Sequence, residues 1–303
     1  MNAPAPLAAT GRAARPVRHF ETPRTLAGKL RFLRYTLARR IVQFGVLVAF
    51  FGTAHWGWSL AGQPLAAGNL SAAKIAGAIP MADPFAVLQM LAARHWLATE
   101  ALVGAAVVLV LYALIGGRTF CGWVCPMNVV TDAAEWARNR LGLRADLLRV
   151  TPAVRYVVLV LALALSAVAG IAAFEWVSPI AMLHRELVFG AGLGLTAALG
   201  VFAFDFAIVR RGWCGHVCPL GAFWALAGRG GQLAVRYDAA SCTRCGDCVK
   251  ACPEPRVINF QALEATGRIA PGECLNCGKC IAVCPESSLR FGLRAAKTIP
   301  DIN

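Results

Sequence analysis

Charged residues are scarce in this sequence. They make up 15% of its 303 residues, whereas a soluble domain carries about a quarter. Hydrophobic residues make up 58%. This imbalance argues against an ordinary soluble chain of this length and favours segments that lie in a membrane.

Acidic residues are the scarcer of the two signs, with 16 Asp and Glu against 30 Lys and Arg. A net charge of +14 could indicate a nucleic-acid partner. The basic residues, however, stand in blocks between apolar runs, which is the pattern of membrane topology rather than of a binding stripe. We therefore expect membrane lipid and no nucleic acid among the partners.

Four apolar runs contain almost no charge, and they predict four transmembrane helices over about 41–60, 98–117, 156–174 and 187–206. About 20 residues at a rise of 1.5 Å each cross a hydrocarbon core about 30 Å thick. A buried soluble helix could explain one such run but hardly four. We expect a membrane domain over residues 39–228.

The basic residues also predict the orientation of the spans. Of the 30 Lys and Arg, 27 fall on one side, and the other side holds only Lys74, Arg94 and Arg185. Because cytoplasmic loops carry the excess of Lys and Arg, both termini are expected in the cytoplasm. Residues 1–38 then form a basic cytoplasmic arm, with 1–25 disordered against anionic lipid. The predicted location is a bacterial inner membrane, crossed several times.

The predicted membrane part contains an internal repeat. Cys121-Gly-Trp-Val-Cys125-Pro follows the second run, and Cys214-Gly-His-Val-Cys218-Pro follows the fourth. On the opposite side, Pro84-Phe-Ala-Val-Leu is echoed by Pro179-Ile-Ala-Met-Leu. Since two spans restore the original side, both C-x₃-C-P elements are expected at the cytoplasmic face. A parallel two-fold repeat would also place them near each other.

The tail after residue 232 carries eight cysteines in two runs of C-x₂-C-x₂-C-x₃-C-P. Three thiolates at this spacing wrap around one [4Fe–4S] cluster, and in two-cluster ferredoxins the fourth serves the other cluster. We therefore predict a small α+β ferredoxin-like domain over 232–303 with two clusters. The ligands are Cys242, Cys245, Cys248 and Cys284 for cluster 1, and Cys274, Cys277, Cys280 and Cys252 for cluster 2.

Zinc and disulfides are the competing interpretations of these eight cysteines. Zinc sites use paired C-x₂-C motifs rather than this longer run with a trailing proline. Disulfides are disfavoured in the reducing cytoplasm that the charge pattern indicates. The spacing favours iron–sulfur clusters over both.

The four cysteines of the C-x₃-C-P elements leave several interpretations open. Thiols four residues apart on a helix project from one face. The four could ligate a metal, exchange electrons as dithiols, or pack as small apolar side chains. The sequence favours no single one of these roles for Cys121, Cys125, Cys214 and Cys218.

A few polar residues near the spans have simple structural interpretations. His55, His95 and His184 fall near the outer face, where quinol oxidation would need proton acceptors. Histidines with satisfied hydrogen bonds are the simpler expectation. Asp205, at the end of the fourth run, is costly in a membrane unless it is paired or hydrated, and Arg210 or Arg211 is a plausible partner.

From about residue 39 to 291, the arrangement resembles the NapH/MauN family of ferredoxin-type membrane proteins. The likeness rests on Trp213-Cys-Gly-His-Val-Cys-Pro-Leu-Gly-Ala and on Cys252-Pro-Glu-Pro, beyond the bare cysteine spacing. The resemblance implies four spans, two C-x₃-C-P motifs and two cytoplasmic [4Fe–4S] sites. It supplies no quinone-binding residue.

The same resemblance implies a quinol dehydrogenase component that draws electrons from the quinone pool. Its partners would be a NapG-like iron–sulfur protein and a periplasmic nitrate reductase chain. The alternative is a membrane polyferredoxin that supplies electrons for maturation or assembly of a metalloenzyme. Cytoplasmic clusters feeding a periplasmic reductase also pose a difficulty, because electrons would have to cross about 30 Å of hydrocarbon.

Overall fold

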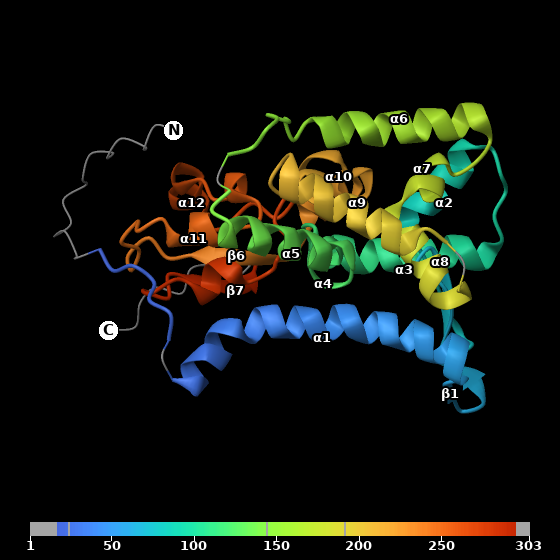
Figure 1. The fold of residues 1–303 in the computed structure, drawn as a ribbon, viewed down its shortest axis with the longest axis horizontal. Helices are drawn as coiled ribbons and strands as arrows, with labels where there is room; N and C mark the ends of the chain where they lie inside the picture. Colours follow the sequence, from blue (N-terminus) through green and yellow to red (C-terminus); the bar gives the residue numbers. More distant parts are fainter. Residues whose placement is uncertain (1–16, 24, 144, 191, 295–303) are drawn as a thin grey trace.

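The structure, a computed structural model, describes residues 17–23, 25–143, 145–190 and 192–294. Long helices run side by side along one axis, and the cysteine-rich tail lies at one end of them (Figure 1). Helix α1, Leu26–Trp56, lies along one side of the molecule and is capped by the Thr25 side chain, which accepts from the Gly28 N–H. Part of the predicted basic arm, residues 26–38, therefore belongs to α1. Residues 1–16 and 24 of that arm lie outside the described residues.

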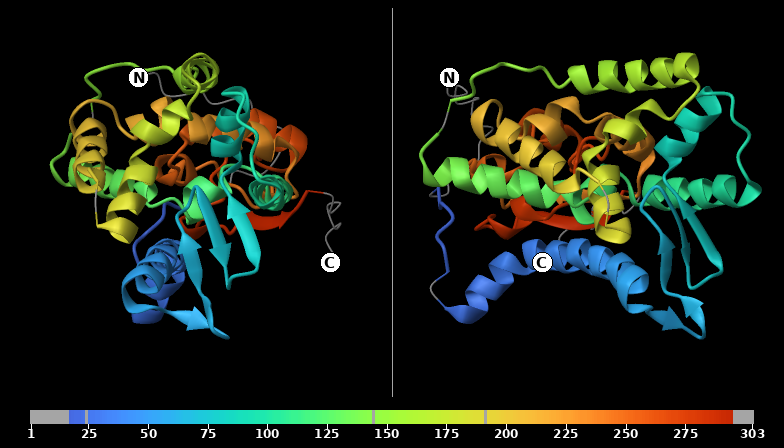
Figure 2. Two further views of the ribbon diagram at one scale, coloured as in Figure 1. Left: turned by 90° about the vertical axis from the view of Figure 1, so that its right-hand side faces the viewer. Right: turned by 45° about the vertical axis from the view of Figure 1, so that its right-hand side comes forward.

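The first half of the helical region continues through a loop of short strands to four helices. The strands are β1 (Ser59–Leu60), β2 (Gln63–Pro64), β3 (Ala66–Gly68), β4 (Ala72–Ile75) and β5 (Ile79–Ala82), and they form antiparallel sheets in the orders β1-β2 and β3-β4-β5. The helices are α2 (Pro84–Ala92), α3 (Thr99–Ile115), α4 (Thr119–Trp123) and α5 (Met127–Arg140). Figure 2 shows the strands beside the far end of α1.

The second half repeats the order of the first, with the short helix α7 in place of the strands. It consists of α6 (Val154–Ala169), α7 (Ala173–Val177), α8 (Pro179–Phe189), α9 (Gly194–Ala207), the π-helical turn η1 (Trp213–Val217), α10 (Pro219–Ala227) and the 3₁₀ turn η2 (Gly228–Gly230). α2 and α8 both begin with proline and are capped by Asp83 and Ser178 respectively. The duplicated sequence thus produces duplicated elements.

Three of the four predicted spans, 98–117, 156–174 and 187–206, are longer than the helices α3, α6 and α9 that the structure forms there. In the run over 156–174, helix α6 ends before Gly170. In the run over 187–206, helix α8 ends before Gly190 and α9 begins only at Gly194. Gly170 and Gly190 both have a positive φ of 67°. Glycine adopts this left-handed conformation at little cost and so ends a helix. Of the described residues, only Leu26–Trp56 form a helix long and apolar enough to cross a membrane, while Thr99–Ile115, Val154–Ala169 and Gly194–Ala207 are shorter apolar helices. The four-span architecture stays a prediction.

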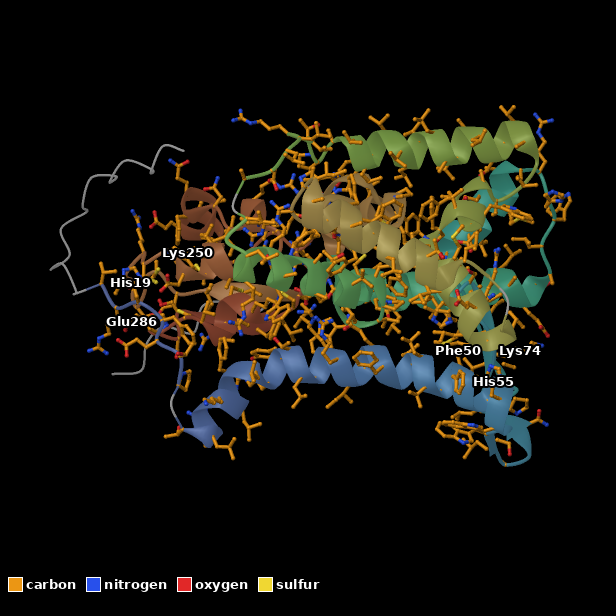
Figure 3. All side chains as sticks on the ribbon, viewed as in Figure 1. His19, Phe50, His55, Lys74, Lys250 and Glu286 are labelled. Carbon is orange, nitrogen blue, oxygen red and sulfur yellow. The ribbon has the colours of Figure 1, made fainter. Side chains whose placement is uncertain are left out.

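The molecule has two distinct ends. Phe50, His55 and Lys74 lie at one end, and His19, Lys250 and Glu286 lie at the other, within or beside the tail (Figure 3). α1 and α6 run away from the tail, and α3 and α9 return toward it (Figure 1). Both C-x₃-C-P elements, which follow α3 and α9, therefore lie on the tail side of the helices, as the repeat predicts.

The tail is a small α+β unit with a core of its own. Strands β6 (Leu233–Tyr237) and β7 (Leu289–Leu293) pair antiparallel and enclose η3 (Pro255–Val257) and helices α11 (Asp247–Ala251), α12 (Phe260–Thr266) and α13 (Lys279–Ala282) in the chain order. Its buried core includes Val235, Ile258, Leu263, Ile269 and Leu289. A separate core, around Phe85, Met127 and Trp224, holds the helices together.

Candidate functional site

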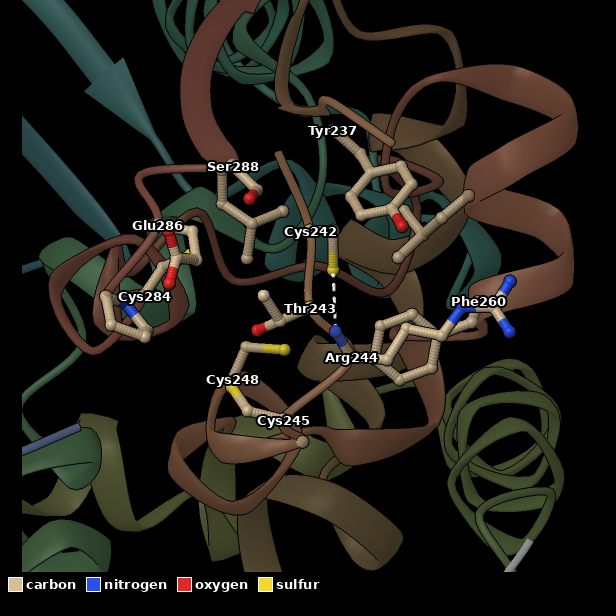
Figure 4. A pocket seen from close by; sticks show the side chains of 14 residues that line it. Tyr237, Cys242, Thr243, Arg244, Cys245, Cys248, Phe260, Cys284, Glu286 and Ser288 are labelled. Atoms are coloured by element: carbon tan, nitrogen blue, oxygen red, sulfur yellow. Dashed lines mark hydrogen bonds between the residues drawn. The ribbon is translucent and has the colours of Figure 1, made fainter. Parts of the chain in front are cut away.

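Four cysteines from the two ends of the tail line a single cavity. Cys242, Cys245 and Cys248 lie on one loop, and Cys284 comes from the other motif (Figure 4). The cavity measures ≈ 410 Å³, its open mouth included. Tyr237, Phe260, Leu263 and Leu289 complete an apolar wall around it. These are the four cysteines that the spacing predicts as ligands of cluster 1.

The other four tail cysteines line a second cavity. It measures ≈ 320 Å³ and is bordered by Cys252, Cys274, Cys277 and Cys280. All four are buried, with at most 8% of each residue exposed. They are the four that the spacing predicts as ligands of cluster 2, so the fold brings each predicted set together by exchanging the fourth cysteine.

The two loops have the same local backbone. Arg244 and Asn276 both have positive φ, at 54° and 50°, and each is followed two residues later by a glycine with positive φ. The Arg244 N–H donates to Cys242 Sγ at 3.3 Å, and the Asn276 N–H donates to Cys274 Sγ at 3.4 Å. Figure 4 shows the first of these bonds. N–H donors to sulfur are one of the means by which a protein sets the potential of an iron–sulfur cluster.

The thiols are crowded enough to disturb one another's ionisation. Burial raises the pKa of the Cys248 thiol to about 11, and the neighbouring sulfurs of Cys242, Cys245 and Cys284 add to the rise. Burial raises the pKa of Cys274 to about 12. Metal ligands must be deprotonated, so a positively charged centre between these sulfurs would favour their thiolate form. Four thiols around an otherwise apolar cavity fit a [4Fe–4S] cluster well.

The four C-x₃-C-P cysteines also meet at one place. Cys121, Cys125, Cys214 and Cys218 line a third cavity of ≈ 350 Å³ between the helices and the tail. Cys125 and Cys218 are 5% and 7% exposed. All twelve cysteines of the chain are free. The fold therefore unites the halves of the repeat at their cysteines.

An ion-pair network that the sequence did not reveal fastens the tail to the helices near this cavity. Arg118 is 1% exposed, and its Nη1 lies 3.1 Å from Glu254 Oε2, two residues after Cys252. Arg155 of α6 lies 3.6 Å from the same carboxylate and also pairs with Glu273. The sequence does contain one sign of these networks, because an arginine stands three residues before each C-x₃-C pair: Arg118 before the first and Arg211 before the second.

A second network lies on α5. Asp132 pairs with Arg40 of α1, with Arg211, and with Lys279 of the tail at 3.1 Å. These cations hold the pKa of the Asp132 carboxyl well below its usual range, although burial acts in the opposite direction. Three separate parts of the chain thus converge on one carboxylate.

The outer residues singled out from the sequence behave differently from one another. His55 Nε2 lies 2.9 Å from the Leu187 carbonyl, and His95 Nε2 lies 2.8 Å from the Gly170 carbonyl, as expected of satisfied histidines. His184 is 1% exposed, and neither of its ring nitrogens has a hydrogen-bond partner among the described residues. The expectation of a satisfied histidine is wrong for His184.

The expected pairing of Asp205 with Arg210 or Arg211 is also wrong. Asp205 Oδ1 accepts from the Trp213 N–H at 2.8 Å, and both arginines pair with Glu135. The cause is the packing of α5 against α9, which brings a carboxylate nearer to the arginines than Asp205 is.

Comparison with known proteins agrees with this geometry. A protein-family model described as a 4Fe-4S binding domain matches residues 97–144 and again residues 191–236, one match in each half of the repeat. A model described as a 4Fe-4S dicluster domain matches residues 234–285. No solved structure matches this chain. The fold and the cysteine sites define a ferredoxin-type iron–sulfur protein.

Curated relatives cover most of the chain. The methylamine utilization ferredoxin-type protein MauN of Methylobacillus flagellatus is 42% identical over 74% of this chain and 78% of its own length. The ferredoxin-type protein NapH of Escherichia coli is 41% identical over 76% and 79%, and that of Haemophilus influenzae is 40% identical over 74% and 77%. The chain belongs to the NapH/MauN family of ferredoxin-type iron–sulfur electron-transfer proteins.

Proposed function

We propose that this chain is a membrane-embedded electron-transfer subunit that oxidises quinol and passes the electrons on through its tail clusters. The observation that carries the proposal is the pair of tail cavities, each lined by the four cysteines that two-cluster ferredoxins use. The two [4Fe–4S] clusters would be held by Cys242, Cys245, Cys248 and Cys284, and by Cys274, Cys277, Cys280 and Cys252. They supply one-electron chemistry when bound.

The membrane part of the proposal is supported by apolar surface on parallel helices. On α6, Val160, Leu161, Leu165 and Val168 are 58–87% exposed, and α1 and α3 present similar side chains. A soluble monomer rarely leaves so many large apolar residues open to water, whereas lipid would cover them. These helices and the charge distribution support the proposal of four spans in an inner membrane with both termini in the cytoplasm.

Quinol is the proposed donor because it is the two-electron carrier dissolved in the bilayer that such helices would occupy. The proposed route leads through a NapG-like iron–sulfur partner to a periplasmic nitrate reductase. The family relationship supports an electron-transfer role, and the identity of the acceptor is part of the proposal.

The test is electron paramagnetic resonance (EPR) of anaerobically purified full-length protein in lipid nanodiscs, before and after addition of menaquinol or ubiquinol analogues. Reduction of the clusters by either quinol would support the proposal. Clusters that dithionite reduces but neither quinol reduces would overturn quinol oxidation. Electrons supplied for maturation of a metalloenzyme would then be the surviving function.

A further inference from the structure

We propose that Cys121, Cys125, Cys214 and Cys218 hold a third [4Fe–4S] cluster, placed between the helices and the second tail cavity. The site unites the two halves of the repeat, since each half supplies one C-x₃-C-P pair. The cluster itself does not depend on the proposed function. Only the direction of electron flow through it rests on quinol oxidation.

The first argument is the likeness of the three cavities. Each is lined by four cysteines and no other thiol, and their volumes are ≈ 410, 320 and 350 Å³ by the same measure. The first two have the cysteine pattern of [4Fe–4S] sites. A third space of the same size and thiol content, closed by Met127, Ile180 and Leu220, suits the same group.

A cluster and a single zinc ion make different demands on four thiolates. Zinc binds sulfur at about 2.3 Å, so four thiolates around one ion close upon it and leave no space between them. An iron–sulfur cube separates its four thiolates by its own width. None of the described residues forms a group of three or more His, Cys, Asp or Glu arranged for a single ion. Neither the tail cysteines nor these four are arranged for a single ion.

Two buried arginines at the site can stabilise a negatively charged group, and each of them also pairs with Glu254. A [4Fe–4S]²⁺ core with four thiolates carries a net charge of −2, which is costly to bury unless a cation lies beside it. Arg118 lines the cavity, is 1% exposed and interacts with the Cys121 sulfur. Thr131 Oγ1 lies 3.2 Å from Cys214 Sγ and can donate to it. The second cation nearby, Arg155, donates to the Gly215 carbonyl at 3.2 Å.

The cavity is next to the second tail cavity. Leu275 lines both of them. Around it, the Arg118 N–H donates to the Cys274 carbonyl at 2.8 Å, and Trp123 Nε1 donates to the Asn276 carbonyl at 2.9 Å. The backbone approaches so closely that a Cβ at Gly122 would lie 2.5 Å from the Leu275 oxygen. A single side-chain layer therefore separates the two sites.

This placement extends the electron path from the tail toward the helices. One electron would pass from a reduced [4Fe–4S]¹⁺ cluster to an oxidised [4Fe–4S]²⁺ neighbour, and no bond is made or broken in that step. In the proposed function, quinol supplies two electrons one at a time and releases two protons. With a cluster at the third site, the electron-transfer distance from a quinol in the bilayer to the nearest cluster would be shorter than the distance to the tail clusters.

The decisive measurement is the iron and acid-labile sulfide content of anaerobically prepared full-length protein. Three clusters predict about twelve iron and twelve sulfide per chain, and two clusters predict about eight of each. Wild-type protein with about eight iron would overturn the proposal, whether or not it also contains zinc. This measurement needs no variant and so does not depend on whether a variant folds.

Paired double variants locate the third cluster. Cys125→Ser with Cys218→Ser should lose about a third of the iron and one EPR signal, while the two tail signals remain. Cys245→Ser with Cys277→Ser, the matched control, should lose about two thirds and keep the signal that the first variant lost. Equal spectra for wild type and the first variant would refute the assignment. A failure of quinol to reduce any cluster would leave this iron count unchanged, so the two proposals fail separately.

Discussion

The Arg118 guanidinium, which follows the second apolar helix, lies 3.1 Å from the Glu254 carboxylate, which follows the first cysteine motif of the tail. The two side chains are 2% and 6% exposed, and Arg155 lies 3.6 Å from the same carboxylate. A charge this deeply buried is stable only with its partner in place. The pair therefore couples the position of the tail to that of the helices.

Glu254→Gln should weaken the attachment of the tail to the helices. It leaves Arg118 and Arg155 with only Glu273 as a carboxylate partner. The loss should therefore lie below about 3–5 kcal/mol, the typical cost of a buried charge without any partner. The midpoint temperature for thermal loss of the cluster absorbance should fall by many degrees. Glu264→Gln is the matched control, because its pair with Arg244 is 44% and 41% exposed and such pairs contribute under about 1 kcal/mol. Similar midpoints for the two variants would contradict a structural role for the buried pair.

The exchange of fourth cysteines between the tail motifs gives a second prediction. Cys284→Ser should alter the EPR signal that Cys245→Ser alters, because both residues line the first cavity. Cys252→Ser should alter the signal that Cys277→Ser alters. If each loop instead kept its own four cysteines, Cys252→Ser would resemble Cys245→Ser.

At each tail site, three of the four cysteines could be grouped from local geometry, and the fourth from the exchange that two-cluster ferredoxins use. In each motif, three cysteines and two residues with positive φ lie within seven positions, so a short loop decides which thiols meet. The repeat in the membrane part could be predicted for a similar reason, since Pro84 and Pro179 start equivalent helices.

The contacts between distant segments could not be predicted in this way. Composition shows that Asp205 needs a partner, but the packing of α5 against α9 decides that Arg211 bonds to Asp132 and Glu135 instead. The helix ends at Gly170 and Gly190 were missed because hydropathy does not register a change of backbone conformation. The meeting of Cys121 with Cys218, by contrast, could be predicted, because a parallel two-fold repeat places its equivalent elements near each other.

Asp83 gives a prediction about pH. Burial, and after it the negative charge of Glu175, raise the pKa of Asp83 to about 7. The folded protein therefore holds a proton that the unfolded chain loses near pH 4, so stability should fall as pH rises from about 4 to about 7. Asp83→Asn should flatten this part of the profile, and asparagine keeps the helix cap that Asp83 forms with the Phe85 N–H. Thermal midpoints between pH 4.5 and 7.5 test this. Parallel profiles for the two proteins would show that Asp83 ionises normally.

The contact between the two glycine-rich turns next to Arg118 gives the last prediction. The Gly117 N–H donates to the Gly228 carbonyl at 3.0 Å, and a Cβ at Gly228 would overlap the Gly117 backbone. Because the obstacle is backbone rather than a flexible side chain, Gly228→Ala must push the end of α3 away from η2. Overpacking of this kind typically costs about 1–3 kcal/mol.

Gly200→Ala is the matched control, since Gly200 lies within α9 and a Cβ there meets nothing within 4 Å. It should leave the thermal midpoint unchanged or raise it slightly, because alanine favours a helix over glycine. Gly228→Ala should lower the midpoint and, by displacing Arg118 from the third cavity, broaden or shift one EPR signal while the other two keep their shape. If Gly228→Ala matched Gly200→Ala in both measurements, the close approach of these two turns would not be what positions Arg118.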